Sequence, residues 1–123
     1  SRIHTFLDSS RGHSDLTELL DPFEHGWTQL TELTDHLKDL AVENREVLGA
    51  VAPNYLKHFA LTVLGYTWCR QVKYAIVNDS AQQDVKYKTA RYFFDMIFPQ
   101  VDVLATRVKR GKEPMMMFDT DEF

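Results

Sequence analysis

The chain has 123 residues with a formal net charge of −4 and a hydrophobic fraction of 44%, which is the size and composition of one globular domain. The acidic balance excludes non-specific nucleic-acid binding, because neutralising phosphates requires clustered Lys and Arg. The single cysteine, Cys69, excludes an internal disulfide framework and fits a reducing compartment, so we expect a cytoplasmic protein.

Membrane insertion and export are not expected. No run approaches ~18 uninterrupted apolar residues, and the N-terminus lacks the basic-then-apolar plan of a signal peptide. The chain starts at Ser1 rather than Met, in a segment that reads as the middle of a longer polypeptide. Residues 1–50 hold ten acids and four bases, whereas residues 51–123 hold eight acids and ten bases, so complementary elements are expected to pack together.

Residues 1–20 mix apolar residues with Ser and Gly, a composition that supports at most a short helical turn followed by a loop. We therefore assign this segment to a linker or a short N-terminal helix. The helical period begins at Pro22, where Asp21 is a suitable N-cap and proline takes the favoured first position. Apolar residues then recur at intervals of three and four, which predicts an amphipathic helix over residues 22–42.

A second helix is predicted over residues 45–78, with Asn44 as its cap and a kink or break at Pro53. Residues 59–69 carry no charge, which is typical of a helix surrounded by others, so we expect this helix to be the most buried. Gly65 costs about 1 kcal/mol relative to alanine unless a neighbour approaches closely, which indicates a helix crossing.

Ser80 and Gln83 form a capping box that opens a third helix, predicted over residues 81–109 and bent near Pro99. Gly111 is a suitable stop, and residues 112–123 are read as a tail. The sequence thus predicts an all-α fold. We expect an antiparallel bundle of three long helices in a domain at residues 21–111, with a short N-terminal helix as an optional addition.

No complete catalytic, cofactor-binding or metal site is found in the sequence. A di-iron site in a bundle needs Glu-x-x-His pairs on two helices, and no such pair occurs. The region from Val47 to Asn78 contains neither Asp nor Glu. A nucleophile with its base, a Gly-rich phosphate loop and a paired-cysteine zinc motif are also missing. We therefore assign no catalytic, cofactor-binding or metal residue to this chain.

The remaining polar and aromatic residues have ordinary interpretations. His58 is expected on the surface, and Glu32 with His36 as a solvated pair one helical turn apart. Burial should raise the pKa of Cys69 and make it unreactive. Packing is favoured over a ligand groove for an aromatic group on the second and third helices: Tyr66, Trp68, Tyr74, Tyr87, Tyr92, Phe93 and Phe94.

Two segments, Asn54–Trp68 and Lys86–Gln100, carry a recognisable set of motifs in a fixed order. The set comprises Tyr55-Leu56, Gly65 with Trp68, Lys86 with Thr89-Ala90-Arg91-Tyr92, and Pro99. In order and spacing it resembles the C-terminal extension domain of FAD-dependent acyl-CoA dehydrogenases, in the branch that includes the 3-methylmercaptopropionyl-CoA dehydrogenases. The likeness covers residues 20–110, and Pro53 departs from the pattern.

The resemblance implies a parent enzyme, a flavin-dependent oxidoreductase of fatty acid metabolism that converts an acyl-CoA to the 2,3-enoyl-CoA. FAD and acyl-CoA are then the parent's cofactor and substrate, and the base and nearly all flavin contacts lie upstream. This chain is implied to be a non-catalytic domain whose partners are the upstream catalytic domains, with a homo-oligomer left open. Arg91 and Lys86 are candidates for charged contacts at such an interface, or for pairs with the acidic first helix.

Two other hypotheses stay open. One is a free-standing interaction module that binds an amphipathic partner helix through an apolar groove. The other is peripheral membrane attachment through Met115–Phe118, which the acidic residues of 119–122 disfavour because anionic lipid would repel them.

Overall fold

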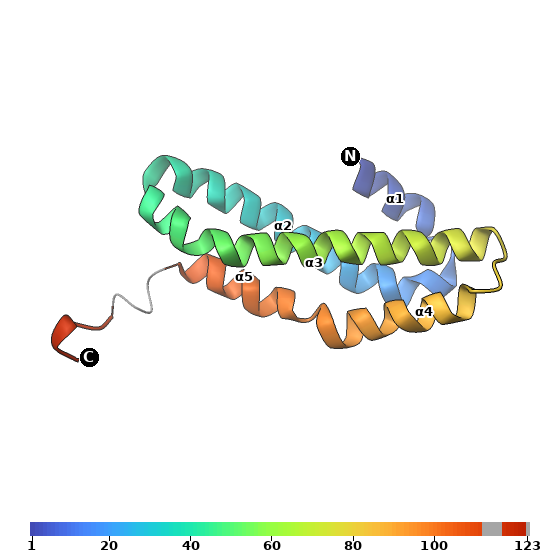
Figure 1. Ribbon diagram of the computed structural model, residues 1–123. Coiled ribbons are helices and arrows are strands. Elements are labelled where there is room, and N and C mark those ends of the chain that lie inside the picture. Colours follow the sequence, from blue (N-terminus) through green and yellow to red (C-terminus); the bar gives the residue numbers. More distant parts are fainter. Residues whose placement is uncertain (112–116, 123) are drawn as a thin grey trace.

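In the computed structural model the chain runs three times along the length of the bundle, each time as helix (Figure 1). We call each of these helical segments a passage. The structure describes residues 1–111 and 117–122. The first two passages are α2 (Thr17–Glu43) and α3 (Arg45–Val77). The third passage consists of α4 (Gln83–Tyr92), the π-helical turn η2 (Phe93–Ile97) and α5 (Gln100–Arg110). The predicted all-α antiparallel bundle is therefore confirmed for the described residues.

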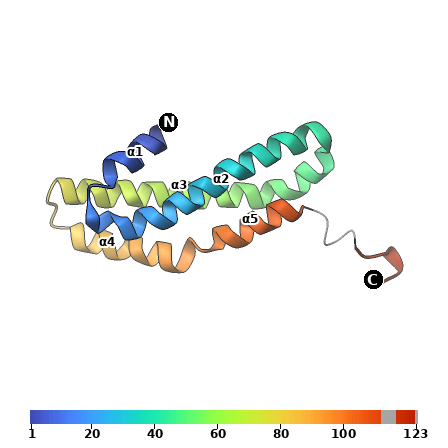
Figure 2. The same ribbon diagram turned by 180° about the vertical axis from the view of Figure 1, so that it is seen from behind.

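Three smaller elements complete the described chain. Helix α1 (Arg2–Ser10) lies beside α3 and is connected to α2 through the 3-10 turn η1 (Ser14–Leu16). A second 3-10 turn, η3 (Thr120–Glu122), follows α5. Seen from behind, α2 crosses α3 obliquely on its way from the α4 end of the bundle to the opposite end (Figure 2). Residues 112–116 and 123, which belong to the predicted tail, lie outside the described residues.

Helix α2 begins earlier than the sequence predicted. The start at Thr17 places Pro22 inside the helix, so the predicted N-cap at Asp21 is wrong. Burial explains the difference, because the side chains of Leu16, Leu19 and Leu20 are fully buried and anchor this first part of the helix. Proline removes only one backbone hydrogen bond here, in the second turn.

The N-terminal segment forms a helix rather than a loop. The Ser1 side chain accepts a hydrogen bond from the backbone N–H of His4 and so caps α1. Leu7 and Ser10 of α1 are buried, and Leu7 belongs to the main hydrophobic cluster. Of the two alternatives for residues 1–20, a short helix is therefore the one that forms.

Helix α3 starts where the sequence placed it. The Asn44 side chain accepts hydrogen bonds from the backbone N–H groups of Glu46 and Val47, as expected for an N-cap. Of the kink or break predicted at Pro53, the break is wrong, because α3 is continuous from Arg45 to Val77. Proline removes the donor that would reach the Gly49 carbonyl, and Gly49 is exposed, so solvent can satisfy that carbonyl.

The prediction that the uncharged stretch of α3 is surrounded by other helices is wrong. Only one side of this stretch is buried, through Thr62, Gly65 and Cys69. Large apolar side chains on the other sides remain exposed to 46–48%: Phe59, Val63 and Leu64. An absence of charged residues therefore does not indicate that this stretch of α3 is fully buried.

The third passage is interrupted before Pro99, as the sequence predicted. Pro99 has no N–H to donate to the Asp95 carbonyl, and its ring disfavours a regular helix at that point. The backbone N–H of Phe98 instead bonds the Phe93 carbonyl at 2.9 Å, a five-residue spacing that widens the turn. Because of this turn, Phe93, Phe94 and Phe98 all point into the core and contact one another.

Ser80 caps the start of this passage only in part as predicted. Its hydroxyl accepts a hydrogen bond from the backbone N–H of Gln82 at 3.1 Å, and α4 begins at Gln83. At the other end, Gly111 follows α5 with a φ of 59°. This left-handed backbone favours glycine, so the predicted stop is confirmed.

Two hydrophobic clusters hold the passages together. The larger one surrounds Phe23, Cys69 and Phe98 at the end of the bundle that contains α4. The smaller one, at the far end, consists of Leu33, Val51, Ala105 and Val108. Gln29 of α2 and His58 of α3, which form a hydrogen bond, lie between the two clusters in the sequence of their helices.

Candidate functional site

One face of α3 is exposed along its whole central part. Its members recur at helical intervals and carry no acid, and we call this set the α3 face: Leu56, Ala60, Val63, Leu64, Thr67, Arg70, Gln71 and Tyr74. Figure 1 views the bundle from a side on which no other helix crosses in front of α3. A rise of ~1.5 Å per residue makes this face roughly 27 Å long.

The chemical character of the α3 face changes along its length. Leu56, Val63 and Leu64 make its first half apolar, with exposed fractions of 62%, 46% and 48%. Its second half is cationic and aromatic, through Arg70 and the 70% exposed Tyr74. An interacting surface would therefore have to combine apolar contacts with negative charge.

Two further cations flank the second half of the α3 face. The Lys86 ammonium donates to the Gln71 side-chain carbonyl at 3.3 Å, and the Lys73 ammonium donates to the Ser9 hydroxyl at 2.9 Å. A groove of 330 Å³ runs between α3 and α4 here, lined by Thr67, Arg70, Gln71, Tyr74 and Lys86. Within residues 1–111 and 117–122, no carboxylate lies within 4.0 Å of Arg70, Lys73 or Lys86.

Neutral and aromatic groups hold these cations in place. The Arg70 guanidinium lies 5.4 Å from the centre of the Tyr66 ring, and the Lys73 ammonium lies 5.1 Å from the centre of the Phe6 ring. Such cation–π contacts orient a side chain without neutralising it. The positive charge of this region is thus fixed in position and still available to a partner.

A second polar feature lies inside the bundle, where His58 is completely buried. The Gln29 amide nitrogen donates to a carboxylate oxygen of Asp102 at 2.8 Å, so the Gln29 carbonyl oxygen faces the Nε2 of His58 at 3.0 Å. This arrangement requires a proton on that Nε2. The His25 ring also contacts Asp102 at 2.7 Å, which makes a chain of four side chains across α2, α3 and α5.

The Thr62 hydroxyl completes the surroundings of His58. It lies 3.3 Å from the Nδ1 of His58 and 2.9 Å from the His58 carbonyl oxygen, to which it can donate. Burial lowers the pKa of His58, and the nearby Asp102 partly opposes that effect. The hydrogen bond from His25 lowers the pKa of Asp102. The predicted surface position of His58 is therefore wrong, because Gln29 and Thr62 satisfy its ring inside the core.

Cys69 has the inert environment that the sequence predicted. It is fully buried, and its thiol faces the Leu19 carbonyl oxygen at 3.7 Å. Burial raises its pKa to about 12, so the thiolate that nucleophilic or metal chemistry requires is scarce at neutral pH.

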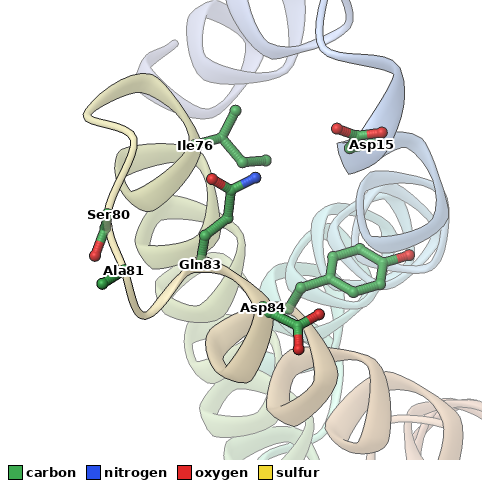
Figure 3. Close-up of a pocket in the computed structure, with 7 residues that line it drawn as sticks. Asp15, Ile76, Ser80, Ala81, Gln83 and Asp84 are labelled. Atoms are coloured by element: carbon green, nitrogen blue, oxygen red, sulfur yellow. The ribbon is translucent and has the colours of Figure 1, made fainter.

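A polar pocket of 540 Å³ lies at the turn between α3 and α4 (Figure 3). Asp15 faces Ile76 and Gln83 across the cavity, whereas the Ser80 side chain points away from it. The Ser80 hydroxyl is engaged in capping, and the Tyr87 hydroxyl donates to Glu18 at 2.9 Å. The lining residues include no histidine, cysteine, lysine or arginine, so the pocket lacks a nucleophile paired with a base.

Further elements of a functional site are missing from the described part of the chain. No group of three or more His, Cys, Asp and Glu side chains there could hold a metal ion. Every described Asp and Glu is exposed, so none offers a carboxylate in an apolar pocket. Of the helices that the structure describes, none combines the length and the hydropathy that crossing a membrane requires.

The two basic residues proposed as interface contacts have different surroundings. Arg91 forms ion pairs with Glu18 of α2 and with Asp95, so it pairs with the acidic first long helix, the second of the two predicted alternatives. Among the described residues, Lys86 forms no ion pair, and its ammonium donates to the neutral Gln71. Lys86 is therefore the better candidate for an external contact.

The aromatic group divides between packing and exposure. Tyr66 stacks on Phe23 at 5.8 Å and meets the edge of Phe6 at 5.2 Å, while Phe93 and Phe94 are buried. Packing is therefore confirmed for these residues. Tyr74 and Tyr92 are exposed to 70% and 62%, and Tyr74 belongs to the α3 face.

Sequence reasoning did not identify Gln29 and Asp102 as partners of His58. Each is a single polar residue on an amphipathic helix, which is a common surface pattern. One signal was available: His58 and Thr62 are one helical turn apart on the side of α3 that also contains Gly65 and Cys69.

Comparison with known proteins places the chain in a family. The family model described as "Acetyl-CoA dehydrogenase C-terminal like" matches residues 1–119. No curated protein and no solved structure matches the chain.

Proposed function

Because the chain belongs to the acetyl-CoA dehydrogenase C-terminal-like family, we propose that it is the non-catalytic C-terminal helical domain of a FAD-dependent acyl-CoA dehydrogenase. The parent enzyme oxidises an acyl-CoA to the 2,3-enoyl-CoA. Within that family we favour the branch of the 3-methylmercaptopropionyl-CoA dehydrogenases, on the motifs around Gly65 and Arg91, and a cytoplasmic location. The family match over residues 1–119 is the main support for this proposal.

Two observations on the described residues support placing the base and the flavin contacts outside this chain. Proton abstraction next to a thioester carbonyl needs a carboxylate held in an apolar pocket, and every described Asp and Glu is exposed. Gly26 and Gly65 face the rings of Phe98 and Phe94, and Gly111 faces the side chain of Val47, rather than an open space that a ligand could occupy. In our proposal the base and the flavin contacts therefore belong to the domains that precede this one.

The test compares this chain with the full polypeptide. Calorimetry of the purified chain with FAD or with an acyl-CoA should show no saturable heat at micromolar concentrations, and circular dichroism should show that the chain is folded. The full polypeptide should carry bound flavin and dehydrogenate acyl-CoA. Stoichiometric FAD binding by this chain alone would overturn the non-catalytic role and direct attention to Tyr66, Trp68 and Tyr92.

A free-standing interaction module remains the second candidate, and a specific cavity supports it. An apolar groove of 260 Å³ between α2 and α3 is lined by Ile3, Phe23, Trp27, Leu30, Phe59, Thr62, Val63 and Tyr66. Such a groove suits an amphipathic helix. Reading the gene upstream of Ser1 separates the candidates: several hundred residues in frame support the dehydrogenase domain, and a nearby start codon supports the module.

A further inference from the structure

We infer that the α3 face is the surface through which this domain docks onto an acidic patch of the preceding domain of the same polypeptide. The inference rests on the proposed function, because that function supplies the preceding domain. It goes further by naming the surface and the chemistry of its partner. Four observations support it: the exposure of the face, its lack of acids, its unneutralised cations and the position of α1.

The apolar half of the face forms one contiguous row on α3. Leu56, Val63 and Leu64 are close together on one side of α3, each between 46% and 62% exposed. Scattered exposed apolar residues are ordinary, but a contiguous apolar row rimmed by polar groups marks an interface. Docking would remove these side chains from water and contribute the hydrophobic part of the association.

The cationic half determines which partner fits. Arg70, Lys73 and Lys86 lie together with no described carboxylate within 4.0 Å, although acids outnumber bases in the chain as a whole. Elsewhere in the described residues, Arg11, Lys88, Arg91 and Lys109 form ion pairs with acids of this chain. A partner surface with Asp or Glu opposite Arg70 would neutralise the positive charge of the face. It would also fix the position in which the two surfaces dock.

A second copy of this chain is a poor occupant of the same face. Symmetric pairing of two α3 helices in parallel would bring Arg70 against Arg70, which is repulsive. Antiparallel pairing would bring the cationic half of each copy against the apolar half of the other. That arrangement buries guanidinium and ammonium groups without a counter-charge, which is costly.

Helix α1 brings the start of the chain to the edge of this region. Ile3 lines the same apolar groove as Phe59 and Val63, and the Phe6 ring meets both Tyr66 and the ammonium of Lys73. In both views the N-terminus lies over the middle of the bundle rather than at one of its ends, and α1 runs from it toward α3 (Figures 1 and 2). Polypeptide preceding Ser1 therefore enters beside the α3 face, which allows the preceding domain to reach it without a long linker.

Site-specific photo-crosslinking in the full polypeptide tests the proposal. Leu64 is replaced by p-benzoylphenylalanine, and mass spectrometry identifies the peptides joined to it. The matched control is the same replacement at Val103 of α5, which is also apolar and is 54% exposed. We expect position 64, and not position 103, to form cross-links to an Asp- or Glu-containing segment upstream of Ser1.

A charge reversal at Arg70 tests the part of the proposal that concerns charge. Arg70→Glu should reduce the cross-link yield from position 64 by roughly tenfold, because like charges would then face each other. Arg107→Glu, at an exposed cation of α5, should leave that yield unchanged. If a protein with the replacement at Leu64 fails to fold by circular dichroism, the replacement is made at the more exposed Leu56.

Each remaining outcome decides against the proposal. Cross-links from position 64 that reach only another copy of this domain would make the face a subunit contact. Equal yields from positions 64 and 103, or no cross-link from either, would show that nothing specific covers the face. Flavin content and dehydrogenase activity of the same preparations report on the proposed function separately, since a flavin-free polypeptide could still show the docking cross-links.

Discussion

The ring of Phe98 lies directly against the backbone of Gly26, so that a Cβ on Gly26 would come within 2.9 Å of the Cε2 of that ring. On its other side the same ring approaches Gly65, where a Cβ would lie 3.1 Å from its Cε1. A single aromatic side chain thus joins α2, α3 and the turn before α5. The glycines exist at these positions because the ring takes the space that a side chain would need.

Gly26→Ala should therefore destabilise the fold. Alanine normally improves a helix interior by about 1 kcal/mol relative to glycine, but overpacking against Phe98 should exceed that gain and give a net loss of about 1–3 kcal/mol. The measurement is the urea midpoint followed by circular dichroism. Gly49→Ala is the matched control, because nothing lies within 4 Å of the position of its Cβ, and it should raise the midpoint.

Gly65→Leu should also lower the urea midpoint. A leucine there would have to displace the rings of Phe94 and Phe98, at a cost of about 1–3 kcal/mol. The sequence predicted a helix crossing at this glycine, and the close neighbours prove to be aromatic side chains rather than backbone. An unchanged midpoint would show that the two rings move aside freely.

Acid should weaken the fold through His58. Burial lowers the pKa of His58 below its usual 6.5, so between 6.5 and that lower value the unfolded chain binds a proton that the folded chain does not. The stability due to the neutral ring is complete above pH 6.5 and is lost as the pH falls below it. His58→Gln should flatten the dependence of the urea midpoint on pH in this range.

The matched control for that experiment is His4→Gln, at an exposed position of α1. It should keep the pH dependence of the unchanged protein. If His58→Gln and the unchanged protein lose stability in parallel below pH 6.5, the acid sensitivity has another origin.

Cys69 should be unreactive until the fold opens. With the pKa of Cys69 at about 12 and its side chain buried, an aromatic disulfide reagent at pH 8 should modify it at least on the order of a hundredfold more slowly than in urea. Release of the coloured thiol over time measures both rates. Rapid modification without denaturant would reveal frequent opening between α2 and α3 at this position.

Several features of the bundle follow from the sequence because their causes are local. Asn44 as the cap of α3, the interruption before Pro99 and the stop at Gly111 depend on backbone donors and dihedral angles within a few residues. The inert character of Cys69 follows from an apolar neighbourhood that is visible in the sequence.

Other features depend on contacts between residues far apart in the chain, and only the tertiary structure decided them. Burial of Leu16 and Leu19 placed the start of α2 before Pro22, and the distant Gln29 and Asp102 made a buried position possible for His58. The uncharged stretch of α3 predicted enclosure, yet α2, α4 and α5 contact only one side of it. Periodicity shows which residues share a face, but whether this chain covers that face depends on how many helices pack around it.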